Sequence, residues 1–434
     1  MSAFTLLFGF AILSFAIRNR SFLKLLSLSV LGVSAYLTLH GYALPLQGFY
    51  LSDGIAFFEL ILFIVLSAFV LNEDENISIT QTLFIGTASI ALLESQTLLN
   101  FIISFEALSI ISFVLVANIK NTTQASGAVK MFIAGSIATA LIVLGTTFYL
   151  FEGASLNAQI GSTGTFGTIG LWIMLSGLFY KLTIVPMHTW AADSYAQIKA
   201  SNAALLSGVA KTVAAIAIFQ TFSPFLLQHI AFNLPILIAL ALITMTLGNF
   251  LALFQKRVAK ILAYSSIAHA GYMLLAFVAV KSSYASTGLL YIAIAYIFMQ
   301  SALFLLIGNI SKDSTQLRLD DLKGFGKKDK LVAFLFTVQL FSLAGVPLLA
   351  GFLSKAVLVY AVVDVDLPIV ALVTLLNSAL SVAYYVWIVK HIYFDEGDSK
   401  LQSLQALPLF AQLILLGGTL YFGVFALDVF KVII

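Results

Sequence analysis

Long apolar stretches recur along the whole of this 434-residue chain. By length, about fourteen of them are able to cross the roughly 30 Å of membrane hydrocarbon, which takes about 20 residues of helix each. Helices are expected because a span in lipid must satisfy its own backbone hydrogen bonds, and the alternating pattern of a barrel strand is absent. Only 9% of the residues are charged, whereas soluble proteins carry about 25%. We therefore predict an all-α polytopic membrane protein with about 14 transmembrane helices.

The charge and the cysteine content exclude several classes of function. The formal net charge is only +3 and there is no basic block or tail, so nothing indicates nucleic-acid binding. The chain has no cysteine, which excludes disulfides, thiolate metal sites and iron-sulfur clusters within it. The five histidines are scattered, without the spacing of a metal site. Any redox chemistry must therefore belong to a partner.

The basic residues indicate how the chain is oriented. Most of the 22 Lys and Arg residues lie in loops that follow odd-numbered apolar stretches, whereas Lys281 and Lys431 lie on the other side. This bias places the basic loops in the cytoplasm and both termini on the periplasmic side. The longest polar connections, residues 312–330 and 153–164, are too short for a soluble domain. We therefore predict one membrane domain over residues 1–434, which begins with a retained helix rather than a signal peptide.

Four ionisable residues lie deep inside apolar stretches: Glu106, Lys181, Lys211 and Lys355. Each costs roughly 2.5 to 3.5 kcal/mol at a bilayer centre, so we expect a function for them, and a row of such groups is what a proton relay requires. A carboxylate that approaches or leaves a buried lysine switches it between holding and releasing a proton. The alternative is a fixed ion pair between Glu106 and Lys181, with the other lysines extended toward the membrane surface.

Proline and glycine interrupt two of the apolar stretches beside a lysine. Pro186 follows Lys181 in the seventh stretch, and the segment LAGVPLLAGFLSK, residues 343–355, leads to Lys355 in the twelfth. Proline inside a helix removes a hydrogen bond, and in membranes such breaks persist where they are buried or line a cavity. A pair of interrupted spans in two halves of a chain is typical of transporters at their ion path. The alternative is that both prolines produce ordinary kinks.

For other polar residues in or near the spans, the sequence indicates a role in the proton relay less clearly. His269 titrates near neutrality and could pass protons between lysines, and a hydrogen-bonded packing role is equally compatible with its position. We expect His188 and Asp193 to cap the cytoplasmic entry to the relay. Glu59 and Glu94 are interpreted as residues at the membrane interface.

Five segments resemble, in order and spacing, the antiporter-like membrane subunits of respiratory complex I and their relatives in Mrp cation/proton antiporters. These segments are LLNFIISFEALSIISFVLVA, GLFYKLTIVPMHTWAADSY, QKRVAKILAYSSIAHAGY, LAGVPLLAGFLSK and NSALSVAYY. Within this family the lysine of the twelfth helix is similar to that of the N subunits of bacterial NADH-quinone oxidoreductases. After the seventh helix the chain keeps Asp193 and Tyr195 but lacks the Glu, Gly and Pro of many relatives.

The resemblance implies a role for each buried ionisable residue. Glu106 matches the glutamate of helix five, Lys181 the lysine of the broken helix seven, and Lys211 the central lysine of helix eight. Lys355 matches the lysine of the broken helix twelve, and His269 a polar position on the axis between the lysines. Together they are expected to form the proton relay.

The family's fold implies two inverted five-helix repeats with broken helices seven and twelve. Residues 1–75 would form helices one to three, residues 76–225 the first repeat and residues 226–396 the second repeat. Residues 397–434 would form the C-terminal helix.

The resemblance also implies a function and partners. It predicts a proton-translocating membrane-arm subunit of an NADH-quinone oxidoreductase in the bacterial inner membrane, driven by quinone reduction elsewhere in the complex. No cofactor is expected in this chain, with quinone, flavin and iron-sulfur clusters in partner subunits. The expected partners are the antiporter-like subunit M, the small subunits K and J, and the lipid bilayer. The alternatives are an Mrp-type secondary cation/proton antiporter subunit, which the scarcity of carboxylates for Na⁺ disfavours, and a purely structural membrane subunit.

Overall fold

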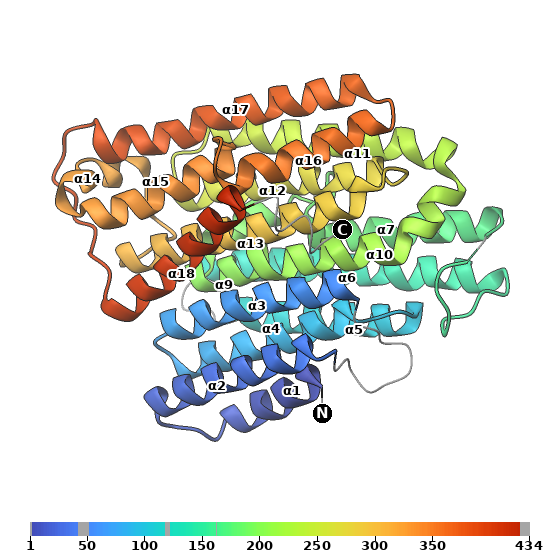
Figure 1. Cartoon of the computed structure of the whole chain (residues 1–434), viewed down its shortest axis with the longest axis horizontal. Coiled ribbons are helices and arrows are strands. Elements are labelled where there is room, and N and C mark those ends of the chain that lie inside the picture. The colour runs from blue at the N-terminus through green and yellow to red at the C-terminus, as the bar shows by residue number, and fades with distance from the viewer. Residues whose placement is uncertain (1, 42–51, 118–121, 162, 426–434) are drawn as a thin grey trace.

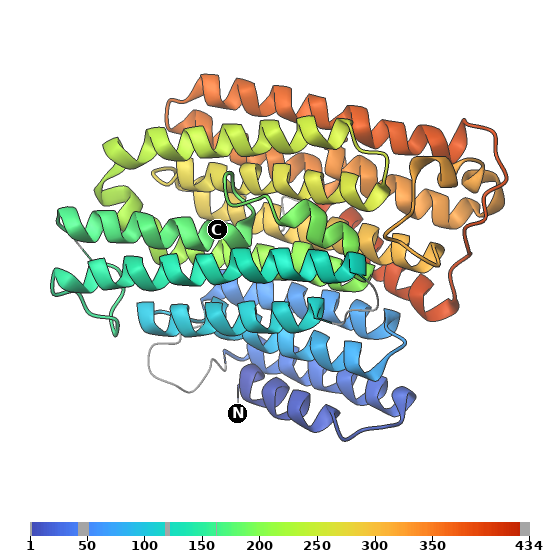
Figure 2. The ribbon, with the colours of Figure 1, turned by 180° about the vertical axis from the view of Figure 1, so that it is seen from behind.

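The computed structural model describes residues 2–41, 52–117, 122–161 and 163–425. Within these residues the regular elements are helices, and an isolated antiparallel bridge joins Arg257 to Arg318. The long helices lie side by side, with the N-terminal helices at one end of the molecule and the helix of residues 368–393 at the other (Figure 1). The last helix, residues 406–424, lies nearer the middle, where it packs against the helices of residues 53–72 and 284–310. Figure 2 shows the same order of helices from behind. Lys431, which entered the prediction of orientation, lies outside the described residues.

The N-terminal half contains the helices that carry Glu106, Lys181 and Lys211. Its elements are α1 (Ala3–Ser14), α2 (Arg20–Leu39), α3 (Asp53–Asn72), α4 (Asn76–Leu93), α5 (Leu98–Val116), α6 (Thr122–Phe151), α7 (Thr165–Leu182), α8 (Ala191–Gln197), α9 (Ala200–Ala204), the π-helix η1 (Leu205–Ala210) and α10 (Lys211–Gln228). The elements α9, η1 and α10 run on without interruption as one apolar span.

The C-terminal half contains the helices that carry His269 and Lys355. Its elements are α11 (Ile230–Leu253), α12 (Val258–Val278), α13 (Tyr284–Ile310), the 3₁₀-helix η2 (Leu319–Leu322), α14 (Phe325–Lys328), α15 (Lys330–Ala344), α16 (Ala350–Asp364), α17 (Pro368–Tyr393) and α18 (Ala406–Val424). Over the described residues, 12 helices are long and apolar enough to cross a membrane. The shorter α1 and the broken pair α15–α16 account for the difference from the predicted number.

Both predicted helix breaks are present. The α7 helix ends at Leu182, where Thr183 adopts a left-handed backbone with φ of 61°, and α8 starts only at Ala191. The α15 helix ends at Ala344, where Gly345 has φ of 92°, a conformation that glycine adopts without the strain of a Cβ atom. Each break leaves the last carbonyls of its helix without a partner inside that helix, so these groups are free to bind something else.

The centre of the molecule is formed by the helices that carry polar residues. The α13 helix and the span from α9 to α10 are buried along their whole hydrophobic length, and α12 is almost so. Ionisable residues in membrane spans face the interior of the bundle, and here Lys211 and His269 lie on these central helices. The outer helices α6 and α17 instead expose large apolar side chains such as Ile137 and Leu372, which suits contact with lipid or with partner subunits.

Candidate functional site

Lys211 lies at the centre of the molecule and is completely buried. Its Nζ donates hydrogen bonds to Thr183 Oγ1 at 2.9 Å, to the Ser266 carbonyl at 3.1 Å and to Ser266 Oγ at 2.5 Å. Thr183 comes from the break after α7, and Ser266 comes from α12. The amine also lies over the ring of Tyr195, 5.7 Å from its centroid. The central lysine therefore joins the broken helix of the first half to a helix of the second.

Lys181 is held by hydroxyl and carbonyl oxygens of α5. Its Nζ donates to Ser112 Oγ at 2.7 Å and faces the Leu108 carbonyl at 3.4 Å. Glu106, on the same helix, accepts from Thr139 Oγ1 of α6 at 3.1 Å on each carboxylate oxygen. The Glu106 charge acts on Lys181, but among the described residues no ion pair within 4.0 Å joins them. The fixed ion pair considered from the sequence is therefore not what the structure contains.

Lys355 binds the carbonyls that the break after α15 sets free. Its Nζ lies 2.8 Å from the Leu343 carbonyl oxygen, 3.3 Å from that of Ala344 and 3.2 Å from Ser378 Oγ. The ring of Tyr272 lies 5.0 Å from the amine. A mostly apolar cavity of about 530 Å³ between α16 and α17 reaches Lys355 and Ser378 from the outer side of the molecule. The break thus supplies oxygen partners for a lysine that also borders a cavity.

His269 lies between the central lysine and Lys355. Its Nδ1 is 2.9 Å from the Ser265 carbonyl, and its ring stacks on Tyr296 with centroids 5.0 Å apart. Ser265 precedes Ser266, the partner of Lys211, and the charges of both Lys211 and Lys355 act on the imidazole. The structure therefore brings Lys211, His269 and Lys355 into one buried series.

Asp193 connects the two halves of the molecule on the side of the predicted cytoplasmic loops. Its carboxylate pairs with Lys130 of α6 at 2.5 Å and with Lys260 of α12 at 3.1 Å. Burial by itself raises the pKa of Asp193, but the hydrogen bonds and charges of the two lysines outweigh it and leave the pKa lowered. The nearby His188 is half-buried, and burial lowers its pKa. Asp193 therefore holds α6 and α12 together through two ion pairs, and neither partner is one of the buried relay lysines.

Two glutamates interpreted from the sequence as interfacial, Glu59 and Glu94, are completely buried in protein. Thr38 donates to Glu59 at 3.2 Å, and the charges of the two carboxyl groups act on each other. Their burial could not be predicted, because it arises where α2, α3 and α4 pack together in the fold.

Several site residues could not be recognised from the sequence. Thr183 and Ser266 bind Lys211, and Ser112 binds Lys181, yet serine and threonine are common in membrane helices. The only available signal was the position of Thr183, two residues after Lys181 in a span interrupted by proline. Because a hydroxyl group both donates and accepts, these residues are able to pass protons between amines.

The arrangement suits the movement of protons better than the binding of a metal. Each of the three buried amines is held by hydroxyl or carbonyl oxygens, and no carboxylate of the described chain lies within 4.0 Å of any of them. In the described ranges no group of three or more His, Cys, Asp or Glu side chains is arranged to hold a metal ion.

Comparison with known proteins adds family evidence to this geometry. The family model described as "NADH:quinone oxidoreductase/Mrp antiporter, TM" matches residues 95–381. F(420)H(2) dehydrogenase subunit N of Methanosarcina mazei is 32% identical over 368 residues, which cover 79% of this chain and 73% of that protein. NADH-quinone oxidoreductase subunit N of Trichlorobacter lovleyi is 29% identical over 409 residues, 88% of this chain and 83% of that protein.

A solved structure shows the same fold. A chain of respiratory complex I from Thermus thermophilus superimposes with a TM-score of 0.85 at 23% sequence identity, covering 98% of this chain and 97% of that one. The similarity extends over nearly the whole length of each chain.

Proposed function

The chain belongs to the NADH:quinone oxidoreductase/Mrp antiporter membrane family, and from this premise we propose that it is a proton-translocating membrane-arm subunit of a complex I-like NADH-quinone oxidoreductase. Protons would move along Glu106, Lys181, Lys211, His269 and Lys355. The relatives named subunit N, which align over most of this chain, support the assignment to a redox-driven complex.

One observation carries the proposal for the relay. Lys211 and Lys355 are each bound by groups that a helix break supplies, Thr183 in one case and the Leu343 carbonyl in the other. A movement at either break would change the oxygen partners of an amine, and with them its tendency to hold a proton. A lysine with a purely structural role would not need partners at a helix break, because partners on a continuous helix would hold its amine more firmly.

The partners and the membrane that we propose for this chain are those of its family, and the proposed orientation follows from the basic residues in its loops. Partner subunits would carry the quinone, flavin and iron-sulfur chemistry, and the chain itself would hold no redox centre. Its neighbours would be the antiporter-like subunit M and the small subunits K and J. The chain would be a multi-pass protein of the bacterial inner membrane with both termini periplasmic, and its two inverted repeats would cover residues 76–225 and 226–396.

An Mrp-type cation/proton antiporter subunit is the second candidate, because the family includes both kinds of protein. Antiport of Na⁺ requires oxygen ligands for the cation, and carboxylates are the usual ones. The proposed route instead consists mainly of amines, since Glu106 is its only carboxylate. Amines carry protons and repel Na⁺, so the redox-driven subunit is favoured.

Purification of the full chain from its native membranes separates the two candidates. A redox-driven subunit will co-purify with flavin- and iron-sulfur-containing chains, and the preparation will reduce quinone. Vesicles containing it will acidify when an electron donor is supplied. Purification without any redox partner, together with Na⁺-driven proton movement in vesicles that lack an electron donor, would contradict the proposal and favour the antiporter.

A further inference from the structure

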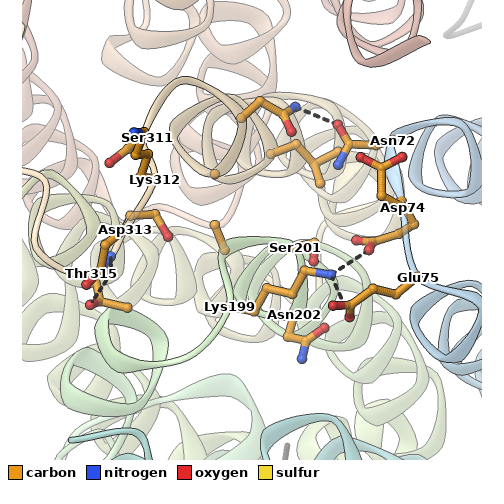
Figure 3. A pocket seen from close by; sticks show the side chains of 16 residues that line it. Asn72, Asp74, Glu75, Lys199, Ser201, Asn202, Ser311, Lys312, Asp313 and Thr315 are labelled. Atoms are coloured by element: carbon orange, nitrogen blue, oxygen red, sulfur yellow. Dashed lines mark hydrogen bonds and ion pairs between the residues drawn. The ribbon is translucent and has the colours of Figure 1, made fainter. Parts of the chain in front are cut away.

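A polar cavity of about 400 Å³ opens where α3 and α13 end and α9 begins. Lys199 projects across it and pairs with Glu73 at 2.7 Å and with Glu75 at 3.5 Å (Figure 3). Asp74, Lys312 and Asp313 also line the cavity. Lys199 and Lys312 belong to the basic connections that face the cytoplasm in the predicted orientation, so under the proposed function the cavity opens to the cytoplasm. None of the five proposed relay residues borders it.

Buried polar groups lie at the floor of this cavity and beneath it. Ser201 lines the cavity and is 5% exposed, while Ser301 and Gln300 of α13 are completely buried. Among the described residues, Ser201 Oγ, Ser301 Oγ and Gln300 Oε1 have no hydrogen-bond partner. Buried polar atoms are rarely left unsatisfied, because each costs about 1–3 kcal/mol, and water is the usual partner where protein supplies none. Three such atoms between one cavity and one lysine indicate a route that water enters.

The Gln300 amide connects this route to the central lysine. Its Nε2 lies 3.5 Å from Ser207 Oγ and 3.3 Å from the Leu262 carbonyl oxygen. Ser207 is four residues before Lys211, and Leu262 is four residues before Ser266, the serine that binds Lys211. One helical turn advances about 5.4 Å, so Gln300 lies about one turn to the cytoplasmic side of the Lys211 amine on both helices.

The local backbone leaves room for Ser301 on this route. Gly208 belongs to the π-helix η1, and a Cβ atom at this position would lie 2.6 Å from Ser301 Oγ. π-Helical turns inside longer helices are frequent at functional sites. Leu305 lines the cavity and is buried, and it lies four residues, about one helical turn, after Ser301 on α13. The route therefore has a polar mouth, an apolar residue one turn further in, Leu305, and a polar inner section.

We propose that this route is a cytoplasmic inlet that delivers protons directly to Lys211 without passing Glu106 or Lys181. Ser201, Ser301 and Gln300 would hold its water, and Leu305 would limit access from the cavity. The inference rests on the proposed function, since it assumes that Lys211 carries protons. It adds a second supply to the central lysine, so loss of Lys181 alone would leave some proton delivery.

Thiol labelling tests whether water reaches the inner section. The chain has no cysteine of its own, so Ser201→Cys and Ser301→Cys each introduce a single thiol with little change in volume. Ser89→Cys is the matched control, because Ser89 is completely buried on α4, does not line the cavity, and its Oγ also lacks a partner within the described chain.

Inverted vesicles expose the cytoplasmic face of the assembled complex to methanethiosulfonate ethylammonium. The mass of this chain then reports modification, whatever cysteines other subunits contain. We expect Ser201→Cys and Ser301→Cys to be modified and Ser89→Cys to remain unmodified. Modification of Ser201→Cys without Ser301→Cys would mean that the cavity is closed at its floor, and it would overturn the inlet.

Gln300→Leu tests whether the route supplies protons, because it removes the amide at similar side-chain volume. We expect electron-driven proton pumping to fall about fivefold, a change of about 1 kcal/mol in barrier. In this variant the supply of protons to Lys211 limits the pumping rate, so a lower pH on the cytoplasmic side should restore part of that rate. A folding defect would not respond to the pH. Gln339→Leu, a buried glutamine on α15, is the control and should pump normally.

Comparison with Lys211→Ala separates failure of the inlet from failure of the proposed function. If Gln300→Leu pumps like Gln339→Leu while Lys211→Ala pumps fewer protons, the inlet is wrong and the relay stands. If Gln300→Leu and Lys211→Ala both pump like the control, the proposed function fails and the inlet with it.

Discussion

Thr183 Oγ1 accepts a hydrogen bond from Lys211 Nζ at 2.9 Å, so the residue that ends α7 is also a direct partner of the central lysine. Thr183 holds a left-handed backbone with φ of 61°, which is uncommon for a β-branched residue. Such a conformation persists only where the surrounding structure maintains it. The helix break and the lysine therefore form one structural unit. A change in the backbone at Thr183 would alter the hydrogen bonding of Lys211, and movement of Lys211 would alter the break.

Thr183→Val should impair proton pumping by several-fold. Valine keeps the shape and the branched Cβ of threonine, but its methyl group cannot accept a hydrogen bond from Lys211. The measurement is electron-driven acidification of inverted vesicles at equal amounts of assembled complex. Thr82→Val is a suitable control, because the Thr82 hydroxyl is completely buried and bonds only within its own helix, to the Ser78 carbonyl at 2.9 Å. Equal pumping by both variants would show that the bond to Thr183 is dispensable.

Lys355→Arg should lower pumping as much as loss of a relay lysine does, although it preserves the positive charge. A guanidinium group does not release its proton under physiological conditions, so arginine can replace a structural cation but not a relay lysine. Assembly is checked by the yield of purified complex, and pumping by acidification of vesicles. An arginine variant that assembles and pumps at the normal rate would limit Lys355 to a structural role.

The sequence predicted the helix breaks because proline and glycine act through local backbone geometry. Pro186 and the segment 345–351 lie where the chain leaves α7 and α15. The lysines were equally visible, since a charge in an apolar stretch stands out wherever it lies in the fold.

The partners of these lysines could not be predicted. Ser266 is 55 residues from Lys211 in sequence, and Ser112 is 69 residues from Lys181. Membrane helices that are apolar all round carry no signal for which face meets lipid and which meets another helix, because lipid and protein interior are equally apolar. The burial of Glu59 and the cavity beside Lys199 depend on this packing and were missed for the same reason.

Asp193→Asn should lower the stability of the protein at neutral pH by about 1 kcal/mol or less, because the ion pairs with Lys130 and Lys260 are partly exposed. Since these lysines hold the folded-state pKa of Asp193 below its ordinary value of 3.8, its contribution to stability is fully present above that value. The contribution is lost as the pH falls through the lower folded-state pKa. The difference in unfolding temperature between the variant and the original protein should therefore be present at neutral pH and vanish in strong acid. A difference that persists in acid would contradict the charge pairing.

Gly351→Ala should disrupt the second helix break. A Cβ atom at this position would lie 1.8 Å from the Ser342 carbonyl oxygen, so α15 and α16 would have to separate. Overpacking of this kind typically costs about 1–3 kcal/mol, and here it would also displace the carbonyls that bind Lys355. Gly417→Ala on α18 is the matched control, because nothing lies within 4 Å of its added methyl group and alanine favours the helix. The unfolding temperature and the pumping rate should both fall in Gly351→Ala. Neither should fall in Gly417→Ala.

The most direct test of the relay is the number of protons moved per electron pair delivered to quinone by complexes that contain Lys211→Ala. Lys24→Ala is the control, because Lys24 is a buried lysine of α2 outside the relay. We predict that the Lys211 variant assembles, and that it moves fewer protons per electron pair than the original complex or the control. An unchanged ratio in an assembled Lys211→Ala complex would contradict the account that protons cross this subunit through its buried lysines.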